Sequence, residues 1–123
     1  MTSFILQSIL LANLITPKIP VFDMEKVLAQ LAYCESSNNP KAYRADDGGS
    51  PSIGLYQFKQ KTWDWAVKRY HIDFRLATST KLIPVIDIWN PEYQRMVARE
   101  MLKEKRFSHW RTCSRKLGLE RFE

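Results

Sequence analysis

The stretch from Asp23 to Pro40, DMEKVLAQLAYCESSNNP, decides how the rest of the chain is interpreted. Asp23 is a good N-cap, and apolar residues then recur at the three- and four-residue spacing of an amphipathic helix. Proline disfavours the α region for the residue before it, so the helix is expected to end before Pro40. The pattern predicts a helix over residues 24–36 with one buried face.

Glu35 continues the buried face of this predicted helix. At 100° per residue it falls about 20° from Met24, between Leu28 and Leu31. Burial and the nearby helix C-terminus should both raise the pKa of its carboxyl group. A carboxyl that stays protonated near neutral pH is suited to act as a general acid toward a glycosidic oxygen. The alternative is a carboxylate at a frayed helix end, turned into water or paired with an arginine.

One small β element is expected after this helix. Residues 46–51 have the composition of a turn, and Ile53–Phe58 follows directly. That run contains Gly54 and is too short for a helix, so it predicts a short strand or hairpin.

Further helices are predicted downstream. Thr62 is expected to cap the next helix, and Asn90-Pro91 is typical of the start of another, which ends near residue 105. Residues 71–89 are expected to form a loop with one short helix. Ser108 is expected to cap a last short helix that ends near Gly118. The predicted class is therefore α+β, mostly α, with a single domain over residues 21–123.

Length and charge narrow the class of partner. The chain has 123 residues, which fits one domain with one hydrophobic core. Its 19 Lys and Arg exceed its 13 Asp and Glu, for a formal net charge of +6. This excess favours a nucleic acid, an anionic membrane or a cell-wall polymer as partner. The sequence has no helix-turn-helix or zinc signature, so no nucleic acid partner is expected. Basic residues concentrate between Arg99 and Arg121, where the alternative is a solvated helix face.

Residues 1–20 form a separate N-terminal segment and linker. Phe4–Ile15 is apolar but shorter than the roughly 20 residues that span a bilayer, so no stable membrane span is expected. It lacks the cationic face of a membrane-active helix. No Lys or Arg precedes it and no small-residue cleavage site follows. We expect either a helical arm or the remnant of an export signal, with Thr16–Pro20 as the linker.

Cys34 and Cys113 are the only cysteines. Together with His71 and His109 they do not have the spacing of a zinc site, so no metal centre is expected. Two interpretations stay open: a pair of buried free thiols, or one disulfide that closes a loop of about 80 residues. The disulfide would stabilise the fold by roughly 4–5 kcal/mol and would imply an oxidising compartment.

Two motifs in this order resemble the signature of lysozyme-like lytic transglycosylases. The first runs from Cys34-Glu35-Ser36 to Asn39-Pro40, and the second is Gly54-Leu55-Tyr56-Gln57-Phe58, followed by Thr62-Trp63. The chain is also similar to goose-type lysozymes and to resuscitation-promoting factor domains. The resemblance covers about residues 24–113. It implies a lysozyme-like fold with a small β hairpin between the first two core helices.

The resemblance implies a role for each matching residue. Glu35 matches the catalytic acid and base, Ser52 a hydroxyl that contacts the substrate, and Gln57 a glutamine that lines the cleft. Tyr56, which stands where methionine or tryptophan is commoner, and Phe58 flank Gln57. The alternating pattern is expected to turn one of them inward and the other outward. The expected substrate-binding residues are Ser52, Gly54, Tyr56, Gln57, Phe58, Trp63 and Trp110, although the two tryptophans are also candidates for the core.

The resemblance further implies an activity. The expected reaction is cleavage of the β-1,4 bond between N-acetylmuramic acid and N-acetylglucosamine in peptidoglycan, by Glu35 alone and without a cofactor or metal. A non-hydrolytic reaction with a 1,6-anhydro product is expected; the alternatives are hydrolysis as in a muramidase and a non-catalytic wall-binding or virion structural domain. Asp46 or Asp47 would supply the second carboxylate that hydrolysis requires. The protein is expected to be a monomer in the periplasm, in the cell wall, secreted, or associated with a phage virion or lysis.

Overall fold

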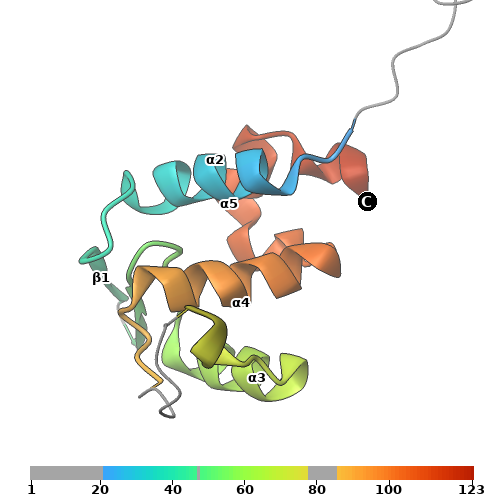
Figure 1. The fold of residues 1–123 in the computed structure, drawn as a ribbon. Helices are drawn as coiled ribbons and strands as arrows, with labels where there is room; N and C mark the ends of the chain where they lie inside the picture. Colours follow the sequence, from blue (N-terminus) through green and yellow to red (C-terminus); the bar gives the residue numbers. More distant parts are fainter. Residues whose placement is uncertain (1–20, 47, 78–85) are drawn as a thin grey trace, which may run out of the picture.

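The computed structural model describes residues 21–46, 48–77 and 86–123 (Figure 1). The expectations for the N-terminal segment, for Asp47 and for residues 78–85 lie outside the described residues. The helices and strands, in chain order, are α2 (Met24–Ser36), β1 (Tyr43–Asp46), β2 (Gly49–Ile53), α3 (Gln60–Tyr70), α4 (Pro91–Lys103) and α5 (Arg111–Lys116). Short 3-10 helices cover Phe74–Ala77, Phe107–Trp110 and Leu119–Phe122. The α+β class, with a hairpin between α2 and α3, is confirmed.

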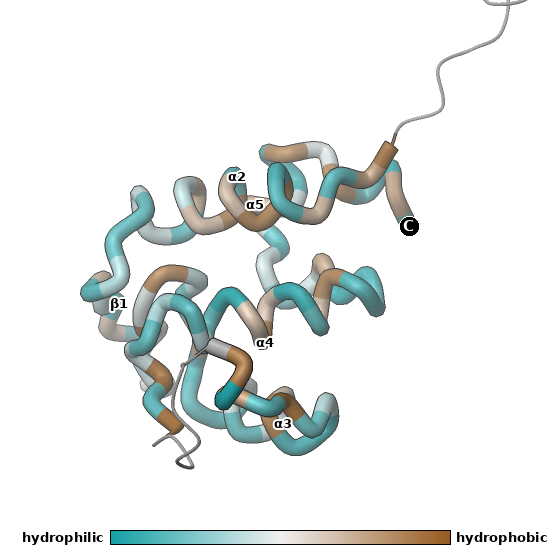
Figure 2. Tube along the Cα trace, viewed as in Figure 1, coloured by the Kyte–Doolittle hydropathy of each residue, from teal (hydrophilic) through white to brown (hydrophobic). Residues whose placement is uncertain are grey.

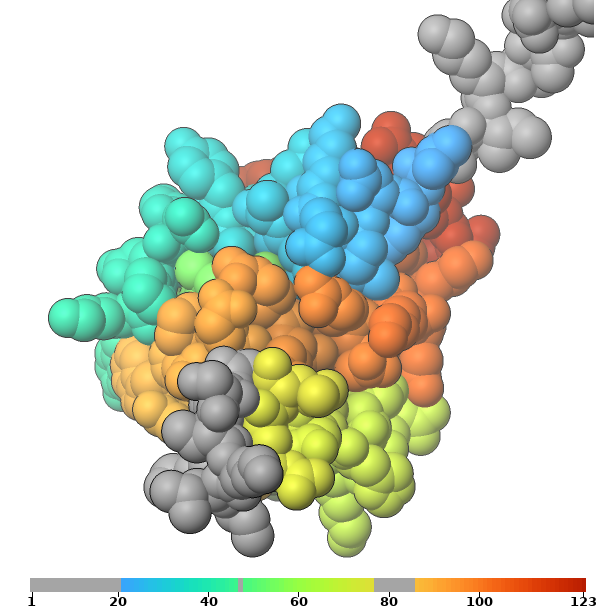
Figure 3. Space-filling view, in the orientation of Figure 1, coloured from blue at the N-terminus to red at the C-terminus, as the bar shows by residue number. Residues whose placement is uncertain are grey.

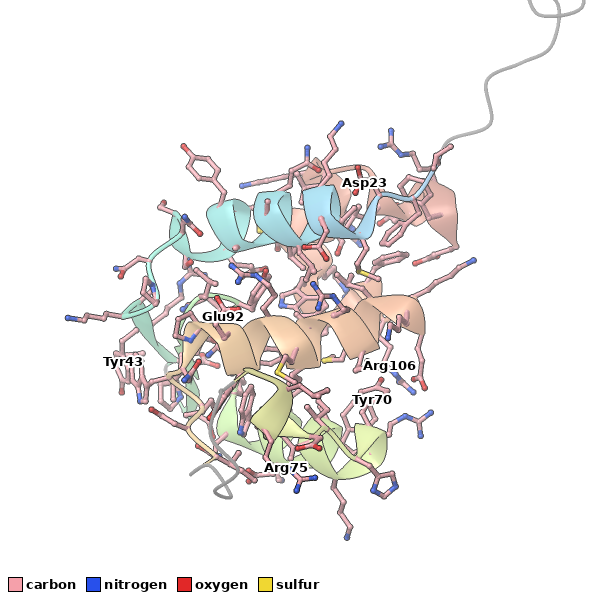
Figure 4. The ribbon with its side chains drawn as sticks, viewed as in Figure 1. Asp23, Tyr43, Tyr70, Arg75, Glu92 and Arg106 are labelled. Carbon is pink, nitrogen blue, oxygen red and sulfur yellow. A yellow bond between two sulfur atoms is a disulfide. The ribbon has the colours of Figure 1, made fainter. Side chains whose placement is uncertain are left out.

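Helix α2 has the bounds that the sequence predicts. The Asp23 side chain, labelled in Figure 4, accepts a hydrogen bond from the Lys26 backbone N at 3.2 Å and caps the helix. At the other end Ser37 adopts a left-handed conformation, with φ of 54°. Its backbone N–H donates to the carbonyls of Ala32 and Tyr33, which closes the helix before Pro40 is reached.

The β element lies earlier in the chain than predicted. Strands β1 and β2 pair antiparallel, with Arg44 opposite Ser52. Of the strand or hairpin expected over Ile53–Phe58, the strand is wrong, since a turn follows Ile53, but the two ends of the segment pair in a single antiparallel bridge. Gly54 and Gln57 in this turn have φ of 78° and 54°, which an extended strand does not allow. Alternation therefore does not apply, and the expectation that one of Tyr56 and Phe58 faces outward is also wrong, because both are fully buried.

The later helices match the prediction in part. Asn90 caps α4 as expected, because its side chain accepts hydrogen bonds from the backbone N of Glu92 and Tyr93. Helix α3 begins at Gln60, so Thr62 lies within its first turn and does not cap it. Helix α5 begins at Arg111 rather than after Ser108, which belongs to the preceding 3-10 helix.

Helix α4 lies between α2 and α3, and α5 lies against α2 (Figure 1). Polar and apolar residues alternate along α4, as expected of a helix with one buried face (Figure 2). In the space-filling view its residues occupy the middle of one face, between α2 above and the 3-10 helix Phe74–Ala77 below (Figure 3).

Across residues 21–46, 48–77 and 86–123, no helix is long and apolar enough to cross a membrane.

Candidate active site

A cleft of about 460 Å³ opens between the C-terminal end of α2, the hairpin and α5. Its lining residues are Cys34, Glu35, Arg44, Ser52, Gln57, Lys59, Thr62, His109, Trp110, Arg111, Thr112, Cys113 and Lys116. The cleft thus brings together residues that lie up to 82 positions apart in the sequence, from Cys34 to Lys116.

Glu35 reaches the cleft from the last turn of α2 and is half-buried there. Burial raises the pKa of its carboxyl group above the usual value of 4.5, and the positive charge of Arg44 partly opposes this shift. Arg44 and Ser52 also line the cleft, because they are cross-strand partners in the hairpin. Among the described lining residues Glu35 is the only carboxylate, while Arg44, Lys59, Arg111 and Lys116 carry positive charge.

The turn over residues 53–57 forms the part of the cleft that carries Gln57. Side chains from three helical segments bind its backbone. Ser36 Oγ donates to the Leu55 carbonyl at 2.8 Å, and Trp110 Nε1 donates to the Tyr56 carbonyl at 3.0 Å. Gln94 of α4 donates to the Ile53 carbonyl at 2.9 Å and accepts from the Tyr56 backbone N at 2.7 Å. These bonds hold the turn in one position relative to Glu35.

Gln57 has most of its side chain buried in this turn. Its Nε2 donates to the Gly54 carbonyl at 2.9 Å, so the amide nitrogen closes the turn on itself. Gly54 lies against α4, because a Cβ added there would overlap the side-chain amide of Gln94. A positive φ and this close approach both favour glycine at the position.

Cys34 and Cys113 form a disulfide, with their Cα atoms 5.9 Å apart. The alternative of two free thiols is therefore wrong. The bond connects the residue next to Glu35 to α5, on the other side of the cleft. It fixes the distance between two cleft walls that are distant in the sequence.

Residues 22–108 match the family model described as Transglycosylase SLT domain. The chain belongs to this family. The matched region contains α2 with Glu35, the hairpin and the 53–57 turn, whereas α5 lies beyond it. No curated protein sequence and no solved structure gives a significant match. Membership of the SLT family supports a peptidoglycan-cleaving activity of the transglycosylase type.

The site residues expected from the SLT resemblance fall into two groups. Glu35, Ser52, Gln57 and Trp110 line the cleft. The side chains of Tyr56, Phe58 and Trp63, by contrast, are packed in the core and do not line it. Tyr56 Oη donates to the Leu28 carbonyl at 2.9 Å, and the rings of Phe58 and Trp63 meet edge to face. Gly54 acts through the backbone of the turn.

Sequence reasoning missed several lining residues of the SLT cleft. His109 is the most unusual, because its ring stacks on Phe58 and its Nε2 is buried without a hydrogen-bond partner. Burial lowers the pKa of His109 to about 4, so the ring is neutral at ordinary pH. Arg44 would have been found if the register of the hairpin had been known.

No group of three His, Cys, Asp or Glu side chains within the described ranges is arranged to hold a metal ion.

Proposed function

We propose that this chain cleaves the β-1,4 bond between N-acetylmuramic acid and N-acetylglucosamine in peptidoglycan, with Glu35 as the single general acid and base. The observation that carries the proposal is the half-buried Glu35 carboxyl in the cleft, whose pKa is raised by burial. A carboxyl with a raised pKa keeps its proton to higher pH and is able to donate it to the leaving oxygen.

In the proposed mechanism the Glu35 proton passes to the glycosidic oxygen as the bond to the muramic acid C1 breaks. The acetamide of the substrate stabilises the positive charge that develops at C1. The Glu35 carboxylate then accepts the proton of the sugar's 6-hydroxyl, whose oxygen bonds to C1 and closes a 1,6-anhydro ring. Glu35 ends the cycle protonated and no water is consumed. Ser52 and Gln57 are proposed to contact the sugars next to the reacting bond.

The anhydro product needs only Glu35, whereas hydrolysis by two carboxylates needs a second one, for which Asp46 is the candidate among the described residues. Hydrolases that use two carboxylates place them about 5 to 9.5 Å apart across the reacting bond. Asp46 does not line the cleft, and its carboxylate pairs with Lys59. A hydrolytic muramidase is the alternative enzyme, in which water replaces the 6-hydroxyl. A non-catalytic wall-binding or virion structural domain is the alternative without chemistry.

We further propose that the protein acts as a monomer outside the cytoplasm, in the periplasm or cell wall, as a secreted protein or with a phage virion. The Cys34–Cys113 disulfide supports this location, because such bonds persist mainly in oxidising compartments.

The test compares turbidity loss of purified walls by the wild type, Glu35→Gln and Glu120→Gln. Glu120 is an exposed carboxylate outside the cleft and serves as the matched control. We expect Glu35→Gln to clear walls at least about 100-fold more slowly, since general acid catalysis contributes at least that factor. Equal clearing by Glu35→Gln would exclude the proposed role. The mass of released fragments identifies the product, because an anhydro end is lighter than a hydrolysed end by one water.

A further inference from the structure

The cleft carries more positive charge than cleavage of a glycan backbone requires. Lys59 is paired with Asp46, and Arg44 acts on the pKa of Glu35. Arg111 and Lys116, which line the α5 wall, have no carboxylate partner within the described part of the chain.

Elsewhere on the described surface some basic residues are paired, whereas others, such as Lys61 and Lys68, form no ion pair, so it is the place of Arg111 and Lys116 at the cleft that distinguishes them. Arg95, Arg99 and Lys103 on α4 each form an ion pair with a nearby glutamate. Arg111 and Lys116 are both exposed, so the packing of the core does not explain them. They also lie beyond residues 22–108, the region that matches the family. Their position at the cleft therefore points to a ligand of opposite charge.

The chemistry of peptidoglycan identifies where that charge would come from. The sugar rings carry only hydroxyl and acetamide groups, which are neutral. Carboxylates occur on the lactyl group of muramic acid when it is free, and on the peptide stem when it is attached. A cationic wall beside Glu35 is placed to meet these groups, because the Cys34–Cys113 bond fixes α5 next to the catalytic carboxyl.

We propose that Arg111 and Lys116 bind carboxylates on the muramic acid substituent, so that strands bearing anionic stems bind better than strands whose carboxylates are blocked. This inference rests on the proposed function, since it takes peptidoglycan as the ligand of the cleft. The α5 wall would then set substrate preference, while Glu35 performs the chemistry.

Binding to insoluble walls tests this directly, in a Glu35→Gln background that leaves the walls intact. The walls are stripped of accessory polymers and used either native or with their carboxyls converted to methylamides. The variant pair is Arg111→Gln with Lys116→Gln. The control pair is Arg115→Gln with Arg121→Gln, which removes the same charge from exposed positions outside the cleft.

We expect the Arg111→Gln/Lys116→Gln double variant to bind native walls about three- to tenfold more weakly at low salt than the Glu35→Gln parent does. This is the size of effect expected for the loss of two exposed charge contacts. On amidated walls the loss should fall below about twofold. The control pair should lose less on native walls than the cleft pair. An equal loss on native and amidated walls, or an equal loss in the control pair, would overturn the inference.

Cleavage by the active protein is measured separately, so that the two proposals fail independently. If the wild type cleaves walls but binding does not depend on amidation, the proposed role of Arg111 and Lys116 is refuted and the enzyme proposal stands. If binding depends on amidation but the wild type does not cleave walls, the enzyme proposal is refuted instead.

Discussion

Removal of the Cys34–Cys113 disulfide is expected to cost a large part of the stability of this domain. The two cysteines are 79 positions apart. In the chain-entropy model, a cross-link over a loop of that length lowers the entropy of the unfolded chain by roughly 15 cal/mol/K. This corresponds to about 4.5 kcal/mol at 25 °C. Small domains are commonly stable by only about 5–15 kcal/mol, so the reduced form would be marginal.

Urea unfolding measures this effect on the oxidised wild type, the reduced wild type and the Cys34→Ala/Cys113→Ala variant. We expect the midpoint to fall strongly in both forms that lack the bond. The slope with urea should rise slightly, because the unfolded chain is less compact without the cross-link. The single variant Cys34→Ala provides a control, since loss of either sulfur removes the same bond and should cost a similar amount.

A loss of less than about 1 kcal/mol in the reduced wild type would contradict loop closure as the source of the stability, because the chain-entropy model predicts several times that amount. It would mean that contacts between α2 and α5 already hold the two walls together, or that the unfolded chain keeps them close without the bond.

Three further perturbations have expected outcomes. Gln94→Leu leaves three buried backbone groups without their side-chain partner, so thermal unfolding should show a loss of at least about 3 kcal/mol; a loss below 1 kcal/mol would contradict the role of Gln94 in the 53–57 turn. The raised pKa of Glu35 means that the folded state holds this proton more tightly than the unfolded state. Stability should therefore fall as pH rises from about 4.5 through the raised pKa, and Glu35→Gln should be more stable than the wild type at pH 8 but not at pH 4. His109 has a lowered pKa of about 4, so the wild type should lose up to about 3 kcal/mol as pH falls from 6.5 to 4. His109→Phe should lack that loss, and equal acid sensitivity of the two proteins would contradict the burial of a neutral imidazole.

The parts of the fold that could be predicted are those with local signals. Asp23 and Asn90 begin helices through their own side chains, and the apolar spacing after Asp23 gives the buried face of α2. Helical periodicity placed Glu35 on that same face, but it left open a carboxylate turned into water, and the expected role at a cleft came from the family resemblance. The two helix starts and the buried face need no knowledge of the rest of the chain.

The features that were missed depend on contacts distant in the sequence. The turn at residues 53–57 takes its shape from Gln94, which lies about 40 positions further along. Thr62 was expected to cap a helix, but α3 begins at Gln60, with Lys59 at the cap position and no side-chain hydrogen bond there to mark the start. Arg111 and Lys116 looked like a solvated helix face, since nothing local indicates that the disulfide brings α5 to the cleft.

The hydrogen bonds from Ser36, Gln94 and Trp110 to the 53–57 turn end on its main-chain atoms, not on its side chains. Ser36, Gln94 and Trp110 therefore specify the path of the turn, while Leu55 needs only to suit the core around it. Substitutions at Leu55 are expected to be tolerated during divergence as long as the three supporting residues persist, whereas Gly54 is held by its positive φ and its contact with Gln94. Distant relatives should then be easier to recognise by the joint presence of those supports than by the letters of the turn itself.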